Sequence, residues 1–599
     1  MSMPTISRRR LRAPVSGLAL RDRGSRHRAS TLPTASAPPS GRGASGLCLA
    51  PAARRIKSAW YFGLHSEEHF RLRSSPLTVA VLACAALLAA ACSDNRSQIM
   101  LTSLPPGYNG VPASLVISTD MTRAAYVVYR NPAEVEVPGS GRAFIHEGCG
   151  VVLDRQEGRT YEYSEVDCLT FSPDSSSFCY VGKRKSGSAF VFNGVAHNFP
   201  GSIPYCPVLS RDGKRFGYVG RRGSDEKYVM IIDGVEHGPY ESISGKEDGS
   251  APLLFNHDGT RWAFSAEGDA GEYVVLDGAA HGPYKAVYGC VFSDDGRHFA
   301  YQANRNGKWS VVFDGNAYGS HDEIMDLKLS ARRGRFAFSA RDCSKDGKTT
   351  TFSVIADGQL LASYQGTSGC EPSHLTFCPD GKRIGYFSCV SGRVCTFVDG
   401  KETSCHDLSG ADERPGVVYA FDPFRDILVY ATCGGYATRS SVVLNGRVLG
   451  SSAEGHSLIA VSADGTSVAF VADDDGEERL MVNESEKWRE RDGIEDFALS
   501  PDGRRTAVTA SLGLRLVVDG IDSGAKWGIS PQSMTFSPDS RHLVYVGWHD
   551  RDTSFVVVDG KRGPRFERIL RGPEFVAERS FRYVASKSAR VFLVEERLP

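Results

Sequence analysis

Two segments of the chain carry the same set of chemically active side chains at the same spacing. Residues 231–243 read IIDGVEHGPYESI, and residues 275–287 read VLDGAAHGPYKAV. An imidazole, a phenol and a carboxylate can bind metal ions or transfer protons. His237 and Tyr240, with their counterparts His281 and Tyr284, are therefore the first residues to test as a catalytic or metal site.

A third copy of this segment exchanges those side chains. Residues 312–324 read VFDGNAYGSHDEI, so Tyr318 stands at the histidine position and His321 at the tyrosine position. A ligand site is not expected to recur in successive units while its donors change places, whereas a packing position that needs a flat, partly polar ring tolerates the exchange. We interpret Asp-Gly as a turn between strands and Gly-Pro as part of an edge strand, where proline is allowed.

The elements that position these residues belong to a longer repeat that begins after residue 110. Each copy has an apolar triplet, a Ser-x-Asp-Gly turn, a basic residue and an alternating run rich in aromatic residues, as in VLSRDGKRFGYVG. Proline and glycine supply the turn, and the alternation predicts a half-buried strand. The twelve copies lie at residues 116–128, 169–182, 208–220, 253–266, 290–303, 327–340, 375–388, 419–431, 460–472, 498–510, 534–547 and 575–586.

About ten residues after each alternating run, many copies contain a second β-branched run that ends in Asp-Gly or Asn-Gly. This dipeptide between apolar runs is the strongest short signal for a hairpin, because both positions accept positive φ. Each unit of about 40 residues therefore predicts four short antiparallel strands, which is the pattern of a β-propeller blade.

The Ser-Pro-Asp-Gly phrase resembles the WD40-like PD40 repeats found in TolB-like propellers and in the propellers of prolyl-oligopeptidase-type enzymes. This resemblance covers about residues 110–599 and implies an all-β fold of tandem β-propellers. Twelve units exceed the usual four to eight blades, so we expect six plus six, with propellers at 93–360 and 361–599; seven plus five is the alternative. The last unit ends after its third strand, at 590–596, and we expect a segment near 97–116 to supply the missing strand and close a ring.

The first 92 residues have a different character. Residues 1–70 are rich in Arg, Ser, Pro and Gly, which predicts a disordered basic extension or sequence upstream of the true start. Residues 71–92 have a positive flank, an uncharged apolar run and small residues before Cys92, as in an export signal. The segment resembles a bacterial lipoprotein signal with lipidation at Cys92, although Ala89 replaces the usual leucine; Cys84 is the competing acceptor, and an uncleaved anchor or plain secretion is the alternative reading.

The charges are distributed unevenly along the chain. Residues 1–75 hold 14 Lys and Arg against 3 Asp and Glu, which leaves 56 against 67 in the remainder. An acidic main body argues against nucleic-acid binding, which requires basic residues that neutralise phosphates. Twelve cysteines follow Cys92, an even number that agrees with disulfides in an exported protein, and their connectivity is left open.

No motif in the sequence indicates catalysis. The chain lacks a G-x-S-x-G elbow, an H-E-x-x-H pair and a phosphate-binding loop, and we assign no catalytic residue and no cofactor. Asp473, Asp475 and Glu477 are a weak candidate for Ca²⁺ because carboxylates suit this ion, but a solvated hairpin tip is favoured. Carboxylates that meet at one face of a ring would instead support the alternative, a hydrolase or lyase acting on glycans or peptides.

Two basic loops are the candidate binding residues. Lys183, Arg184 and Lys185 occupy the same loop of one unit that Arg221 and Arg222 occupy in the next. We expect both loops to project from one face and to attract an acidic protein or an anionic glycan. The sequence thus predicts an exported, lipid-anchored and non-catalytic scaffold, facing the periplasm or the cell surface, whose partner is a protein or an envelope polysaccharide; a spacer without a specific ligand is the third reading.

Overall fold

The computed structural model describes most of the chain after residue 95. The described residues are 96–103, 113–130, 132–137, 141–154, 156–157, 162–243, 253–366, 371–390, 393–407, 414–423, 425, 427–433, 440–452, 456–474, 476–491, 493–550 and 552–598. The predicted extension at 1–70 and the predicted signal at 71–92, with Cys92, lie outside the described residues.

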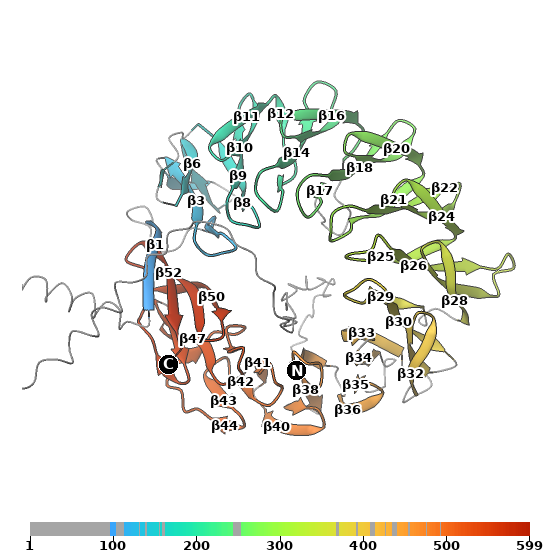
Figure 1. Cartoon of the computed structure of the whole chain (residues 1–599). Helices are drawn as coiled ribbons and strands as arrows, with labels where there is room; N and C mark the ends of the chain where they lie inside the picture. Colours follow the sequence, from blue (N-terminus) through green and yellow to red (C-terminus); the bar gives the residue numbers. More distant parts are fainter. Residues whose placement is uncertain are drawn as a thin grey trace, which may run out of the picture. The chain divides into compact units, whose positions relative to one another are not determined.

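Within the compact unit Cys92–Pro599, the described strands form twelve antiparallel sheets of four or five strands that follow one another around a ring (Figure 1). We number these sheets as blades 1 to 12 in chain order. In each blade the strands pair in sequence, the first near the centre of the ring and the last at the outer edge. The fold is therefore an all-β propeller, as the repeat predicted.

The strand bounds follow the twelve repeats. Blade 1 has β2 (Val116–Ile117), β3 (Ala124–Arg130), β6 (Gly148–Leu153) and β7 (Gln156–Glu157), with the hairpin β4 (Ala133–Val137) and β5 (Gly141–Ile145) inserted after β3. Blade 2 has β8 (Glu165–Phe171), β9 (Phe178–Arg184), β10 (Gly187–Phe192) and β11 (Val195–Phe199); blade 3 has β12 (Gly201–Ser202), β13 (Val208–Leu209), β14 (Phe216–Arg222), β15 (Tyr228–Ile232) and β16 (Val235–Tyr240); blade 4 has β17 (Leu254–Phe255), β18 (Trp262–Gly268), β19 (Gly271–Leu276) and β20 (Ala279–Tyr284).

The next four blades have longer inner strands. Blade 5 has β21 (Ala286–Phe292), β22 (Phe299–Arg305), β23 (Lys308–Phe313) and β24 (Asn316–His321); blade 6 has β25 (Glu323–Leu329), β26 (Phe336–Cys343), β27 (Thr350–Ala356) and β28 (Gln359–Gly366). Blade 7 has β29 (Ser373–Phe377), β30 (Ile384–Val390), β31 (Arg393–Val398) and β32 (Lys401–Asp407); blade 8 has β33 (Arg414–Asp422), β34 (Ile427–Cys433), β35 (Ser440–Leu444) and β36 (Arg447–Ser452).

The last four blades complete the ring. Blade 9 has β37 (His456–Val461), β38 (Val468–Asp474), β39 (Glu477–Val482) and β40 (Ser485–Glu490); blade 10 has β41 (Ile494–Leu499), β42 (Thr506–Ala510), β43 (Arg515–Val518) and β44 (Ile521–Asp522). Blade 11 has β45 (Gly528–Ile529), β46 (Thr535–Phe536), β47 (Leu543–Asp550), β48 (Thr553–Val558) and β49 (Lys561–Arg562); blade 12 has β50 (Arg568–Ala577), β51 (Ser580–Lys587), β52 (Arg590–Arg597) and, from the other end of the chain, β1 (Arg96–Ser103).

The Ser-x-Asp-Gly phrase forms the turn between the first and second long strands of a blade. In blade 3 the Ser210 hydroxyl donates to Asp212 Oδ1 at 2.7 Å and accepts the Arg215 amide at 2.9 Å. Hydrogen bonds from the Lys214 ammonium group and from Ser210 lower the pKa of Asp212 to about 2. Gly213 has a φ of 66°, a backbone conformation that favours glycine. The sequence motif is thus a self-contained turn that each repeat carries with it.

The strand β1 closes the ring, which confirms the expectation for the segment near 97–116. It pairs with β52, and the Arg96 guanidinium donates to the two carboxylate oxygens of Glu596 at 2.7 and 2.9 Å. The Tyr126 hydroxyl of blade 1 donates to the Ser103 carbonyl at 2.6 Å. The two ends of the described chain therefore complete one blade together.

The blades continue without a break across residue 360, so the described sheets form one ring of twelve where we expected two rings of six. Ala337 and Val354 of blade 6 share a buried cluster with Leu375 and Tyr386 of blade 7. Each blade has an apolar face that must be covered by the next blade, and a division at this point would expose that cluster to water. The seven-plus-five alternative meets the same objection, because each blade follows its neighbour around the one ring.

Two disulfides join described cysteines. One links Cys168 of blade 2 to Cys206 of blade 3, and the other links Cys395 to Cys405 across β31 and β32. The sequence predicted disulfides without their connectivity. Among the residues that the structure describes, no helix is long and apolar enough to cross a membrane.

Candidate functional site

The histidines and tyrosines that first suggested chemistry are packing residues. His237 lies on the outer strand of blade 3, with its ring centroid 4.8 Å from that of Trp262 in blade 4. Tyr318, at the equivalent position of blade 5, lies 4.8 Å from Phe336 in blade 6. Burial lowers the pKa of His237, which favours the neutral ring. This geometry confirms that the position requires a flat ring against the next blade.

The second exchanged position has the same role. The Tyr284 and Tyr301 rings meet edge to face at 6.0 Å, and their hydroxyls are 3.0 Å apart. In the next blade His321 packs against Phe338 at 5.9 Å and places Nδ1 2.7 Å from the Asp342 carboxylate. Tyr284 thus meets a ring and a hydroxyl of the next blade, whereas His321 meets a ring and a carboxylate. Both side chains pack against the next blade, so the exchange of His and Tyr preserves packing.

The two predicted basic loops are the β9–β10 and β14–β15 hairpins, which are equivalent in blades 2 and 3. The cationic side chains of these hairpins form ion pairs with nearby carboxylates. Lys183 Nζ lies 2.7 Å from Glu165 and 3.1 Å from Asp167, and Arg184 pairs with Glu162. The loops thus carry less free positive charge than the sequence suggested, and Lys185 is exposed at the tip.

The arginines of the β14–β15 hairpin in blade 3 are also paired with nearby carboxylates. Arg221 pairs with Glu226 at 3.1 Å, and Arg222 pairs with Glu236 and lies 3.7 Å from Asp225. Such exposed pairs contribute little to stability, but they reduce the attraction for an anionic partner.

The weak calcium candidate is only partly described. Glu477 pairs with Arg489 at 2.8 Å and with Arg491 at 3.4 Å, and Asp473 accepts the Gly476 amide at 3.0 Å. Asp475 lies outside the described residues. Cys395, Glu402 and Cys405 bring possible metal-binding atoms within 4.8 Å of one another, but the two sulfur atoms form a disulfide.

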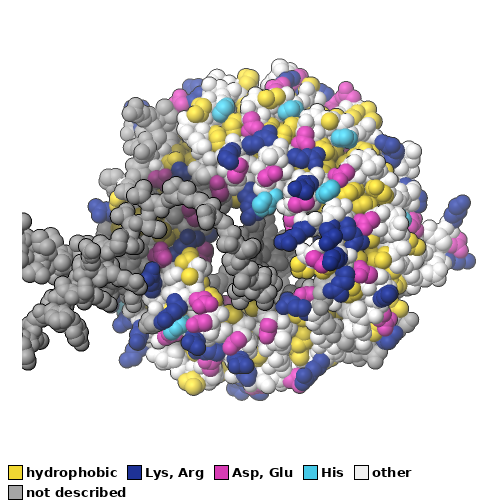
Figure 2. All heavy atoms as spheres, viewed as in Figure 1, with side chains coloured by type: hydrophobic (Ala, Val, Ile, Leu, Met, Phe, Trp, Pro, Cys, Tyr) yellow, Lys and Arg dark blue, Asp and Glu magenta, His cyan; other side chains and the backbone are white. Residues whose placement is uncertain are grey.

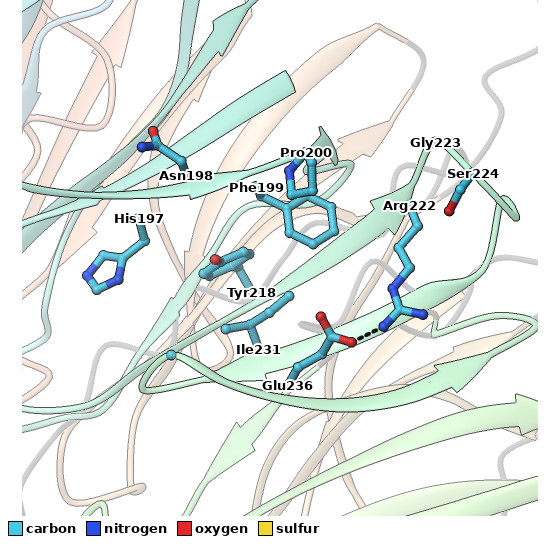
Figure 3. A pocket seen from close by; sticks show the side chains of 11 residues that line it. His197, Asn198, Phe199, Pro200, Tyr218, Arg222, Gly223, Ser224, Ile231 and Glu236 are labelled. Atoms are coloured by element: carbon cyan, nitrogen blue, oxygen red, sulfur yellow. Dashed lines mark hydrogen bonds and ion pairs between the residues drawn. The ribbon is translucent and has the colours of Figure 1, made fainter. Parts of the chain in front are cut away.

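A groove of about 740 Å³ lies between blades 2 and 3. Phe199 and Pro200 come from the end of β11 and the connection to blade 3, while Tyr218 and Ile231 come from β14 and β15. Arg222 is the last residue of β14, and Gly223 and Ser224 belong to the β14–β15 loop. Figure 3 shows Tyr218 and Ile231 between His197 on one side and the Arg222–Glu236 pair on the other. The groove therefore has an apolar floor and a charged end.

The groove offers recognition groups more readily than catalytic groups. Burial raises the pKa of Tyr218 to about 12, with a contribution from Glu236, so its hydroxyl stays protonated at neutral pH. Glu236 contributes the carboxylate of the described lining, and Arg222 neutralises it. Acid–base hydrolysis of glycosides uses a pair of carboxyl groups, which this lining does not provide.

An arginine at one position of the repeat connects neighbouring blades. In blade 3 the Arg215 guanidinium binds Asp233 at 2.7 Å and reaches the Gly259 carbonyl of blade 4 at 2.9 Å. We call such a residue an inter-blade arginine. Blade 2, beside the groove, has Ser177 at this position, and its hydroxyl accepts a hydrogen bond from Asn193 of the same blade. The same contact to the next blade is made by Arg123, Arg261, Arg335 and Arg505.

The turn of blade 6 carries a positive charge where the Ser-x-Asp turns of other blades carry a negative one. Blade 6 has Arg332 where the other Ser-x-Asp turns have the aspartate, and Arg333 donates to the Asp380 carbonyl of blade 7 at 2.8 Å. Figure 2 shows Lys and Arg side chains gathered on this part of the rim, while acidic and basic side chains alternate over much of the remaining visible face.

Of the predicted binding residues, Arg222 lines the groove and the other four do not. The sequence analysis missed Phe199, Tyr218 and Glu236 because each fits the repeat pattern of its own blade. Ser177 was the available signal, since it stands where other copies have a basic residue.

The ring of four-stranded blades defines the described chain as a β-propeller protein. No protein-family model matches the sequence, and no curated protein matches it. Among solved structures, a eukaryotic initiation factor aligns over 74% of this chain and 96% of its own, with 11% identity and a TM-score of 0.31. The Myceliophteria thermophila Cps50 (Swd1) β-propeller domain aligns over 45% and 98%, with 12% identity and a TM-score of 0.21.

A third solved structure is the dihydro-heme d1 dehydrogenase NirN in complex with DHE. It aligns over 58% of this chain and 72% of its own, with 16% identity and a TM-score of 0.24. These scores are too low to carry an inference about function, which must come from the site.

Proposed function

We propose that the chain is an exported, lipid-anchored and non-catalytic scaffold that binds a partner of the cell envelope. Of the two partner classes that the sequence suggested, protein and polysaccharide, the groove between blades 2 and 3 favours an extended polypeptide. The observation that carries this choice is the position of the groove beside β11, the outer strand of its sheet.

An edge strand offers unpaired backbone groups to which an extended segment can add. Phe199, Tyr218 and Ile231 would receive an apolar side chain of that segment, while Arg222 and Glu236 would orient a polar one. Main-chain pairing would supply affinity and the floor would supply specificity. The alternative of a hydrolase or lyase has no such support from the described lining, where Glu236 is already neutralised.

We expect a photoreactive residue at Ser224 of the form 93–599 to crosslink a polypeptide from envelope extracts. Ser224 is exposed and lines the groove, so Ser224→Trp should fill the space and lower capture of the same polypeptide by about ten-fold or more. Lys348→Trp is the matched control, because Lys348 is exposed in the equivalent loop of blade 6. Equal capture by the Ser224→Trp and Lys348→Trp variants would remove the groove from the proposal.

The membrane anchor has a separate test. Cys92→Ala should abolish fatty-acid labelling of the full chain and release it from the membrane fraction, because the acceptor thiol is lost. Cys84→Ala serves as the control and should leave both labelling and fractionation unchanged. Labelling that persists in Cys92→Ala would contradict the lipoprotein assignment.

A further inference from the structure

A second pocket lies between blades 11 and 12 and belongs to neither predicted binding loop. Its volume is about 390 Å³, within the range of roughly 300–1,000 Å³ for small-molecule sites. Its lining comes from β47, β48, the residue after β45 and the residues at the start of β50: Ser530, Val546, Trp548, Asp550, Thr553, Ser554, Glu567, Arg568 and Ile569.

Trp548 provides an aromatic wall that its neighbours hold in place. A Cβ atom at Gly528 would lie 2.1 Å from the indole ring, so only glycine allows the ring to rest against this backbone. The side chain of Trp548 is partly exposed where it lines the pocket. A half-buried aromatic ring offers an apolar surface with little loss of conformational entropy on binding.

Polar groups surround this ring at the mouth of the pocket. Asp550 and Glu567 are exposed carboxylates, and Arg568 is an exposed guanidinium. One carboxylate oxygen of Glu567 also accepts the Ser588 amide at 2.8 Å. A hydrogen bond from Thr553 and one from the Asp552 amide hold the pKa of Asp550 below its usual value. Asp550 therefore stays ionised at neutral pH and accepts hydrogen bonds.

Ser554 lies beneath the mouth of the pocket. It is 9% exposed, and its backbone amide and carbonyl both pair with Phe566 at 2.8 Å. Its hydroxyl is covered by neighbouring protein atoms. The polar groups that a ligand can reach therefore include the exposed side chains of Asp550, Glu567 and Arg568.

We propose that this pocket binds a pyranose unit of a polysaccharide. The apolar face of the sugar ring would stack on Trp548, and its hydroxyls would donate to Asp550 and Glu567. Arg568 would accept a carboxylate substituent in the bidentate geometry that guanidinium groups favour. This site is about half the volume of the groove and is independent of it, so the two proposals stand or fall separately.

The test uses the form 93–599 on an array of hexose, N-acetylhexosamine and hexuronate oligosaccharides, followed by calorimetry with the oligosaccharides retained. Wild type should bind at least one sugar class. Trp548→Ala should lower that affinity by about ten-fold or more. Trp309→Ala is the matched control, since Trp309 is a partly buried tryptophan of blade 5 outside the pocket, and it should retain binding.

Asp550→Asn keeps the test valid if Trp548→Ala fails to fold. Asp550 is an exposed residue of the pocket lining, so the substitution should leave the unfolding temperature nearly unchanged. Sugar affinity should fall several-fold, because hydrogen bonds to a charged acceptor are stronger than those to a neutral one. Arg568→Ala should weaken hexuronate binding selectively. Absence of binding by wild type, or equal affinity of wild type, Trp548→Ala and Asp550→Asn, would overturn the proposal, and Ser224→Trp should retain sugar binding.

Discussion

A chain that begins at residue 113 should unfold at a markedly lower temperature than the form 93–599. The deletion removes β1, which pairs with β52 over seven residue pairs and places the buried Leu101 in a core with Val584 and Val591. Loss of one buried leucine side chain costs about 2–5 kcal/mol. Deletion of the strand also removes the ladder and opens the last blade, so we expect a larger loss.

The measurement is thermal unfolding followed by circular dichroism, with a synthetic peptide of residues 94–112 added in excess. The peptide should restore the unfolding temperature of the shortened chain in proportion to its concentration, because it binds the folded form. A scrambled peptide is the control and should have no effect. Unchanged unfolding after the deletion would show that β1 does not close the ring.

Arg215→Ala should lower the free energy of unfolding by about 1–2 kcal/mol. An isolated surface ion pair such as Arg215–Asp233 is worth less than about 1 kcal/mol, but Arg215 also donates to the Gly259 and Thr260 carbonyls of the next blade at 2.9 and 3.2 Å. Its guanidinium lies 5.5 Å from the centre of the Phe255 ring. Removal therefore loses contacts in two blades at once.

Urea unfolding measures this effect, and hydrogen exchange locates it. Lys214→Ala is the matched control, because Lys214 is the neighbouring exposed cation and binds only Asp212 of its own turn. Arg215→Lys should recover little, since an ammonium group lacks the planar set of donors that reaches both blades. In Arg215→Ala, backbone hydrogen exchange should become faster at the interface of blades 3 and 4. If Lys214→Ala and Arg215→Ala had equal stability, the inter-blade arginine would contribute no more than an ordinary surface charge.

The residue at the position of the inter-blade arginine varies around the ring. It is Ser177 in blade 2, His298 in blade 5, Ser467 in blade 9 and His542 in blade 11. His298 and His542 each place Nδ1 2.6 Å from an aspartate of their own blade. At the closure of the ring, Arg571 of blade 12 reaches the Ser118 carbonyl of blade 1 at 3.0 Å.

The sequence alone determined the blade. Its repeat specifies local interactions: the hydroxyl–aspartate turn, the alternation of each strand and the Asp-Gly hairpin all act within about 40 residues, as the Ser210–Asp212 turn illustrates. The reading of His237 and Tyr318 as packing residues succeeded for the same reason, because repetition reveals a packing position. The closing strand near residue 97 was predicted because the last repeat lacks one strand.

Only the tertiary structure decided the number of rings, the pairing of charges and the sites. Each blade presents the same kind of apolar face to its neighbour, so local signals fit one ring of twelve as well as two of six, and the small rotation between blades determines which closes. Arg222 meets Glu236 across the edge of a blade, and Trp548 and Glu567 of neighbouring blades line one pocket. These contacts join residues that no local pattern relates, which is why the candidate sites emerged only when the blades were assembled.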